Sequence, residues 1–355
     1  MKTVLRFIAS GDFQAHNWSQ FSYIRKDGVN SRLHNILKVF GFIRKEAKER
    51  EIDKVLLNGD IFEESDYHPT DVYNSVYMQI ERMHDDGLDV VINLGNHDIF
   101  KSANGNRIHT LTPFRKVATI VEKPQLVWEH LYAVPYLPAE QVKEAVKEIA
   151  IGRPLALVCH AGVQGATVGP KRYLVRNQLK LADMHPEKFD IVLLSDYHTA
   201  QRLADNVLYL GSPLQHTFGE THKPCIWDVS LWAHSPGYRL EKIYTHFPMF
   251  VRAQIYDQED LQDVTKTAKG NYLHLDVFSK EITDEDIKKF AEENNVHVRV
   301  QRKADSESPS SKTGSWAASP LQLIDKFVRT KVGGEKQRES LTSLGRDLYE
   351  GKESD

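Results

Sequence analysis

The chain has 355 residues, of which 46 are Lys or Arg and 49 are Asp or Glu, so its formal net charge is -3. This balance excludes a protein that binds polyanions through bulk positive charge. Hydrophobic residues make up 41% of the chain, which excludes full disorder, and the length predicts two domains or one large domain with an appendage. A mean hydropathy of -0.47 and the lack of a long uncharged apolar run argue against a membrane span or a membrane partner.

The N-terminal segment and the cysteines indicate the cellular compartment of the protein. The segment MKTVLRFIASGD contains Arg6 within its apolar stretch and leads into an acidic turn, which is typical of a first strand and not of a secretory signal. The two cysteines, Cys159 and Cys225, cannot form a disulfide framework, and there is no CxxC motif. We therefore expect a cytoplasmic protein.

Apolar runs typical of strands recur through the first two thirds of the chain, with amphipathic helices between several of them. The strands are expected at Val4–Ala9, Lys54–Leu57, Asp89–Leu94, Leu155–Val158 and Asp190–Leu194. The helices are expected at Ser31–Arg50, Thr70–Asp85 and Ala139–Ile149. This alternation predicts an α/β fold in which helices cover the faces of a sheet.

The pattern changes near residue 250. Strands are expected at 251–256, 272–278 and 296–301, and helices at 258–269 and 283–294, which together predict a small α/β domain over residues 250–303. Residues 304–319 are rich in Ser, Lys and Gly and are expected to form a linker. Residues 320–355 are expected to form two short amphipathic helices separated by Gly333 and Gly334.

Polar side chains follow each of the five early strands. Because the carboxyl ends of strands in an open α/β sheet form the edge where ligands bind, we expect these side chains to lie close together. A single Gly-Asp pair is most often a turn, but five such strand ends in succession indicate metal chemistry. The residues are Asp12, Asp60, Asn96, His97, His160, Asp196 and His198.

These candidate ligands combine carboxylate, imidazole and amide groups without a thiolate. Such a set suits hard to borderline divalent ions and disfavours a closed structural zinc site. It is too large for one ion, whereas two ions about 3.5–4 Å apart that share one carboxylate would use it. We therefore expect two divalent ions, Mn²⁺ in first place and Mg²⁺ as the alternative, and attack on a phosphate ester by a metal-bound hydroxide.

The order of these residues resembles the calcineurin-like metallophosphoesterases, whose motifs run D-x-H, G-D, G-N-H-D, a strand-terminal His, and G-H-x-H. Residues 1–249 carry the resemblance, and the most specific motif is Gly95-Asn96-His97-Asp98. The segments YLGSPL at 209–214 and FGE at 218–220 resemble, more narrowly, the SbcD-type DNA repair exonucleases and their phage-encoded relatives. A phage origin would place the protein in the host cytoplasm.

The resemblance implies a sandwich of sheets flanked by helices, with residues 250–303 as a capping and DNA-binding domain. It also implies a role for each site residue. One ion would be held by Asp12, Gln14, Asp60 and His198. The other would be held by Asp60, Asn96, His160 and Asp196, so that Asp60 bridges the pair. His97 would act at the scissile phosphate without binding metal, which makes His97 and Asp60 the expected catalytic residues.

Two positions depart from the family pattern. Gln14 and Asp196 stand where the family has histidines. Both can still offer oxygen to a metal ion, although each could instead hydrogen-bond to a residue that binds the metal. Gln14 is a weaker, neutral ligand that would loosen the first site, and His16 lies close enough in sequence to substitute. Asp196 adds charge and favours Mn²⁺ or Mg²⁺ over Zn²⁺.

Two loops combine basic and aromatic residues that suit phosphate contact and base stacking. The loop after the first strand contains Trp18, Arg25 and Lys26. The segment after His160 contains Lys171, Arg172 and Arg176. A solvated basic face is an equally good interpretation of either.

These observations predict a metal-dependent DNA exonuclease or endonuclease, the nuclease subunit of an SbcCD-like repair and recombination complex. The resemblance implies a coiled-coil ATPase of SbcC type as the partner of residues 320–355, and a homodimer is also compatible with it. Two alternatives stay open. One is a phosphatase or cyclic-nucleotide phosphodiesterase of the same superfamily, and the other is a degenerate scaffold without catalysis.

Overall fold

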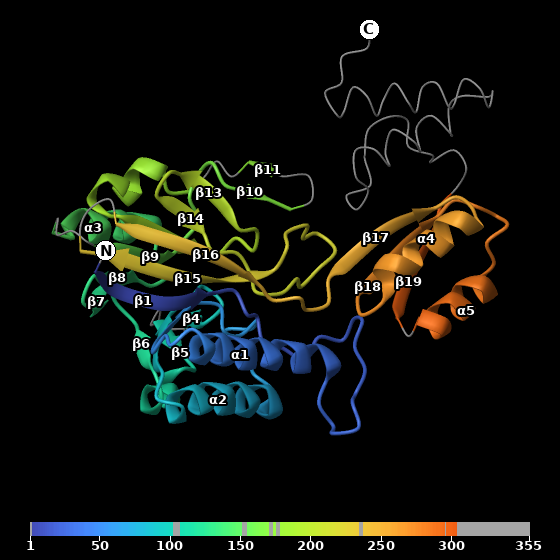
Figure 1. Cartoon of the computed structure of the whole chain (residues 1–355), viewed down its shortest axis with the longest axis horizontal. Helices are drawn as coiled ribbons and strands as arrows, with labels where there is room; N and C mark the ends of the chain where they lie inside the picture. The colour runs from blue at the N-terminus through green and yellow to red at the C-terminus, as the bar shows by residue number, and fades with distance from the viewer. Residues whose placement is uncertain are drawn as a thin grey trace, which may run out of the picture. The chain divides into compact units, whose positions relative to one another are not determined.

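The computed structural model divides into two units, Met1–Pro248 and Met249–Asp355 (Figure 1). The structure describes residues 2–101, 107–150, 155–169, 173–174, 178–233, 237–294 and 296–303. The expected linker at 304–319 and the expected helices of 320–355 lie outside the described residues, as do Lys171, Arg172 and Arg176. Within the described part of the chain, no helix combines the length and apolarity that a membrane crossing requires.

The first unit is built on two six-stranded sheets. The first has the order β16 (Tyr238–Tyr244), β15 (Cys225–Trp232), β1 (Thr3–Ser10), β2 (Lys54–Asn58), β3 (Asp89–Asn93), β6 (Thr119–Val121). The second has the order β13 (Gln201–Ala204), β14 (Val207–Tyr209), β12 (Ile191–Ser195), β9 (Ala156–His160), β8 (Leu131–Val134), β7 (Gln125–Trp128). In both sheets the central strands run parallel, and the antiparallel pairs lie towards the edges.

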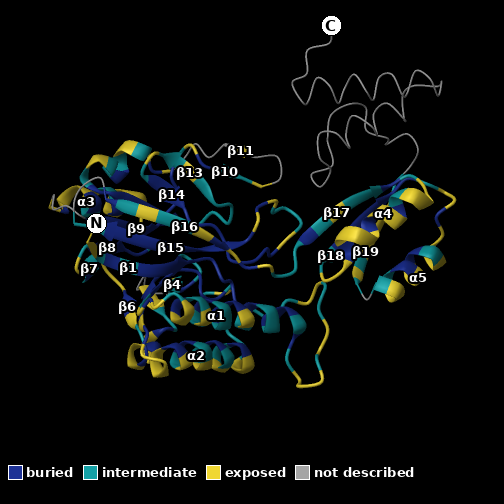
Figure 2. Ribbon diagram, in the orientation of Figure 1, coloured by how far each residue is buried: buried dark blue, intermediate teal, exposed yellow. Residues whose placement is uncertain are grey.

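Three helices cover the outer faces of these sheets. Helices α1 (Ser31–Glu49) and α2 (Thr70–Asp85) pack on the first sheet, and α3 (Ala139–Glu148) packs on the second (Figure 1). α1 begins where the Asn30 side chain accepts hydrogen bonds from two backbone N–H groups, which satisfies donors that a helix start leaves open. Figure 2 shows the buried strands between helices whose outer sides are exposed.

Strand side chains alternate between two separate cores, which shows why the molecule forms layers. On β1, Phe7 and Ala9 point into the core between the two sheets, whereas Ile8 joins the core beneath α1 and α2. On β12, Leu193 faces the other sheet and Val192 faces the core beneath α3. Because both faces are buried, β12 and the C-terminal half of β1 are continuous apolar runs without polar alternation. The predicted fold class, an α/β sandwich of sheets flanked by helices, is confirmed.

Shorter elements join the layers. The described residues also form two separate two-stranded antiparallel sheets, β4 (Ile99–Lys101) with β5 (Arg107–His109), and β10 (Thr167–Val168) with β11 (Tyr173–Leu174). The described part of the chain also contains the 3₁₀ turns Thr112–Lys116, Leu181–Met184 and Pro186–Lys188. The first of these small sheets follows directly after Asp98, so it begins at the edge where the site lies.

The second unit has a parallel three-stranded sheet in the order β17 (Phe250–Ile255), β18 (Tyr272–Val277), β19 (His297–Arg302). The crossovers are α4 (Gln258–Ala268) and α5 (Asp284–Asn294), as the β-α-β-α-β pattern predicted. Leu261 and Val264 of α4 and Phe290 of α5 pack with strand residues such as Leu273 in one apolar cluster. The second unit therefore has a hydrophobic core of its own.

Candidate metal centre

The candidate residues follow the carboxyl ends of β1, β2 and β3 in the first sheet and of β9 and β12 in the second. The turns after β1 and β2 are joined by backbone hydrogen bonds, from the N–H of Asp12 to the carbonyl of Gly59 (3.0 Å) and from that of Gln14 to the carbonyl of Asp60 (2.9 Å). Asp12 and Asp60 both adopt left-handed backbone, with φ of 58° and 52°. Left-handed backbone at residues other than glycine costs free energy and is most common at functional sites. The two strained turns therefore indicate that the surrounding structure holds the side chains of Asp12 and Asp60 in fixed positions.

Two glycines allow the loops to approach closely. A Cβ on Gly59 would lie 2.3 Å from Nδ1 of His160, and the φ of Gly59 is +85°. A Cβ on Gly95 would lie 2.1 Å from Oδ1 of Asp60. Both distances are far below van der Waals contact, so the Gly-Asp and Gly-Asn-His-Asp motifs need their glycines to bring Asp60 and His160 together.

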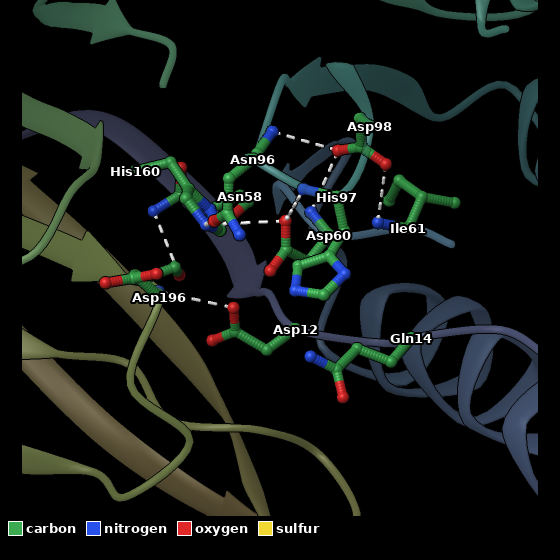
Figure 3. A network of polar contacts seen from close by, with 12 residues as sticks. Asp12, Gln14, Asn58, Asp60, Ile61, Asn96, His97, Asp98, His160 and Asp196 are labelled. Carbon is green, nitrogen blue, oxygen red and sulfur yellow. Dashed lines mark hydrogen bonds and ion pairs between the residues drawn. The ribbon is translucent and has the colours of Figure 1, made fainter. Parts of the chain in front are cut away.

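Three buried side chains converge at this edge. Among the histidines, cysteines and acidic residues that the structure describes, Asp12, Asp60 and His160 form a group whose ligand atoms all lie within 4.8 Å of one another. The amide oxygen of Asn96 joins them, 3.0 Å from Nε2 of His160. Figure 3 shows these side chains pointing toward one another from their separate strand ends.

The hydrogen bonds around this group fit a metal ion. Nδ1 of His160 donates to the carbonyl of Asn58 (2.9 Å), so Nε2 is the ring atom that can offer a lone pair to a metal ion once it loses its proton. That atom faces Oδ1 of Asn96 and, at 3.5 Å, Oδ1 of Asp60, both of which are also lone-pair donors. Oδ2 of Asp12 is buried without a hydrogen-bond partner among the described residues. These buried oxygen and nitrogen atoms can each offer a lone pair to one cation, as the ligand shell of a metal ion requires.

The electrostatics favour a cation at the same point. Burial raises the pKa of Asp12 to about 7, although the charges of His160 and His198 oppose the shift. Burial alone would lower the pKa of His160, but the charge of Asp60 and its hydrogen bond raise that pKa to about 10. Without a metal the carboxylates therefore retain a proton on His160, and a divalent cation would replace that proton.

Asp98 holds the turns after β2 and β3 together. Its buried carboxylate accepts hydrogen bonds from the backbone N–H groups of Asp60, Ile61 and Gly95, each at 2.9 Å. It therefore fixes the backbone of one metal-binding candidate and of the loop that carries Asn96 and His97 (Figure 3).

His97 lies beside the group without belonging to it. Its backbone N–H donates to Oδ1 of Asp60 (3.0 Å), and Nδ1 of its ring donates to the carbonyl of Glu63. Although burial lowers its pKa, the charge of Asp60 raises the pKa of His97 above the usual value. In Figure 3 the imidazole lies between Asp60 and Gln14 and faces Asp12.

His198, Gln14 and Asp196 form the other side of the site. Nδ1 of His198 lies 2.7 Å from Oε1 of Glu220, and its Nε2 lies 3.1 Å from the amide nitrogen of Gln14. Asp196 is mostly buried, adopts φ of 114°, and donates its backbone N–H to Oδ1 of Asp12 (3.2 Å). The expected coordination by Gln14, Asp196 and His198 stays a prediction, as do the other assigned site roles.

The candidate DNA-binding residues that the structure describes lie in the loop between β1 and α1. The ring of Trp18 is half-buried, with the guanidinium of Arg32 4.8 Å from its centroid, so Trp18 packs against the protein itself. Arg25 forms an ion pair with Asp27 (3.1 Å), and Lys26 is exposed. Their contact with DNA stays a prediction.

Sequence reasoning missed the residues that support the ligands. Asp98 and Glu220 both occur in motifs that were recognised, but no structural role followed from the motifs alone. Asn58, the last residue of β2, accepts from His160 through its carbonyl and donates its side-chain amide to Ser195 (3.0 Å). The one available signal was a polar residue at the end of an otherwise apolar strand.

A model of the calcineurin-like phosphoesterase family matches residues 5–298. This match spans most of the chain, so the protein belongs to the calcineurin-like phosphoesterases, a family of metal-dependent hydrolases of phosphate esters. None of the curated proteins compared with the chain matches it.

Two solved structures were also found to be similar to this chain. A dimetal phosphatase from Danio rerio is 10% identical, with a TM-score of 0.41, over 69% of this chain and 97% of its own. The nuclease MPE of Pseudomonas putida is 12% identical, with a TM-score of 0.29, over 67% of this chain and 87% of its own.

We predict that Mn²⁺ affinity rises with pH. Because the pKa of His160 is about 10 and that of Asp12 about 7, binding must displace the proton on His160, and below pH 7 that on Asp12 as well. The association constant should rise about tenfold per pH unit between about pH 7 and 8, and more steeply below pH 7. Calorimetric titration in two buffers of different ionisation enthalpy measures both the affinity and the released protons. An affinity independent of pH would contradict this account of the site.

Proposed function

We propose that the protein is a Mn²⁺-dependent phosphodiesterase that cleaves the DNA backbone, as an exonuclease or endonuclease of SbcD type. The position of His97 carries the proposal. Both its backbone N–H and its ring Nδ1 are engaged, so the imidazole is fixed with Nε2 left to meet a substrate. A fixed histidine next to a cluster of metal ligands is suited to phosphate ester hydrolysis.

The parts of the site would divide the reaction between them. Two divalent ions, when bound, would neutralise phosphate charge and lower the pKa of water. Asp12, Asp60, Asn96 and His160 would hold and orient one ion, which places Asp12 with His160 and not, as the resemblance implied, with His198. Asp60 would bridge to the other ion, as the resemblance implies. His97, with its raised pKa, would donate a proton to the departing oxygen from Nε2 or stabilise the crowded phosphorus centre.

The choice of DNA as the substrate rests on the segments that narrow the sequence resemblance. In the structure these segments support the site. The hydroxyl of Tyr209 donates to the carbonyl of Ala161 and accepts from the N–H of Val163, which holds the loop after His160. The backbone N–H of Ser212 donates to the carbonyl of His198, and Glu220 contacts the ring of His198. A segment typical of the nuclease group thus positions one of the predicted ligands.

One incubation tests the proposal. The purified full chain is given Mn²⁺ with end-labelled linear DNA, and in parallel with bis-p-nitrophenyl phosphate. Degradation of the DNA supports the proposal. Hydrolysis of the small ester alone would favour a phosphatase or cyclic-nucleotide phosphodiesterase, and bound metal without either activity would favour a scaffold.

The variant His97→Ala should lower the cleavage rate by about 10²–10⁴-fold, the usual contribution of an acid–base group. Metal content should stay at the wild-type value, because His97 lies outside the ligand group. His84→Ala, which removes an exposed histidine of α2, is the matched control. Lost metal stoichiometry in His97→Ala would make His97 a ligand and reject its catalytic role.

We further propose that residues 320–355 bind a coiled-coil ATPase of SbcC type in the cytoplasm. Short amphipathic helices are unstable alone and must bury their apolar stripes on a partner or on the enzyme. Deletion of residues 305–355 should leave hydrolysis of a small diester nearly intact and should abolish co-purification with the ATPase. A truncated chain that loses the small-ester activity would assign these residues to the catalytic unit instead.

A further inference from the structure

Gln14 and His198 contact each other at the side of the site where the sequence predicts one of the two metal ions. The amide nitrogen of Gln14 lies 3.1 Å from Nε2 of His198. The other ring nitrogen of His198 is held by Oε1 of Glu220, whose Oε2 accepts the backbone N–H of His216 (2.8 Å). The Gln14 amide can pair with either protonation state of Nε2, through its NH₂ or its carbonyl. The side chain of Gln14 therefore covers the atom of His198 that a metal ion would need.

The two sides of the site differ in this respect. On the other side, Asp12, Asp60 and His160 already converge, with Oδ1 of Asn96 among them. His198 is not a member of this group among the residues that the structure describes. Figure 3 shows Gln14 on the opposite side of Asp12 from His160. One ion position is thus assembled in advance, and the other requires a hydrogen bond to be broken first.

The backbone holds Gln14 in place for this contact. Its φ is 47°, its N–H donates to the carbonyl of Asp60 (2.9 Å), and its carbonyl accepts from Nε1 of Trp18 (3.3 Å). With the backbone fixed at both ends, only rotation of the side chain can release His198. Histidine tolerates left-handed backbone better than most residues, so Gln14→His is a mild change to the loop.

We propose that Gln14 is a positioning residue that makes the two ion positions unequal. One ion binds firmly through Asp12, Asp60, Asn96 and His160, and the second binds weakly because it must displace the Gln14 amide from His198. This inference rests on the metal dependence within the proposed function and not on the DNA substrate. Changes next to a metal ligand typically alter affinity by about 10–100-fold, so a difference of at least about tenfold between the two ions is expected.

The experiment is a calorimetric Mn²⁺ titration of the metal-free full chain without substrate. The wild type should show two binding events whose dissociation constants differ by at least about tenfold. In Gln14→His the second event should tighten by about 10–100-fold while the first is unchanged. The electron paramagnetic resonance signal of a coupled Mn²⁺ pair should then appear at lower Mn²⁺ concentration.

Three further variants distinguish whether Gln14 covers His198 or is itself a ligand of the second ion. If Gln14 covers His198, Gln14→Ala should leave the second ion as tight or make it tighter, whereas a ligand role requires that ion to weaken. Glu220→Gln should weaken the second ion alone, and the unchanged first ion reports that the variant is folded. Asn17→Ala is the matched control in the same loop, since Asn17 pairs with Asp71 (2.8 Å), and it should change neither ion.

Two ions of equal affinity in the wild type, or loss of the second ion in Gln14→Ala, would overturn the inference. Either result would leave the proposed DNA cleavage intact. Conversely, intact metal binding without DNA cleavage would reject the substrate and retain the role of Gln14. A chain that binds no Mn²⁺ at all would overturn this inference and the metal dependence together.

Discussion

The carboxylate of Asp98 is the interaction on which the site depends. It gathers three backbone N–H groups from two different strand ends, so the turns after β2 and β3 cannot move apart without leaving buried donors unpaired. Because Asp60, Asn96 and His97 lie on these turns, one side chain outside the candidate ligand group holds the backbone that carries all three. The buried amide and carbonyl of Asn58 extend this framework to the second sheet, through Ser195 and His160.

The framework is needed because the site is unfavourable by itself. Asp12, Asp60 and Asp196 are largely or wholly buried close together, and burial raises the pKa of Asp12 and of Asp196. Such a cluster repels itself in a poorly solvated place and is tolerated only where surrounding structure over-determines it. The apolar layers on both faces of each central strand supply that rigidity, and the stored negative potential is what a cation would neutralise.

The sequence predicted the parts of the structure that have long, one-sided or continuous apolar patterns. Helices α1 and α2 and the strands β1, β2, β3, β9 and β12 were predicted to within one or two residues. The short strands of residues 119–134 and the antiparallel strands β15 and β16 were not predicted. Three or four residues carry too little periodicity. Asp228 and Ser230 interrupt the apolar run of β15, and the edge strand β16 mixes polar with apolar residues. Candidate ligands could be proposed because they follow strands. The partners of His198 could not, since a carboxylate 22 residues away in sequence has no local signature.

The position of β1 has a consequence for the order of events during synthesis. β1 lies between β2 and β15, and its first residue, Thr3, pairs with Trp232. The strand that leads into Asp12 therefore gains its second neighbour only after almost the whole first unit has left the ribosome. Contacts between such distant segments form slowly, and an unpaired apolar strand invites aggregation until they do. During synthesis, one edge of β1 would therefore stay without a hydrogen-bonded neighbour until the residues of β15 have been made and can pair with it.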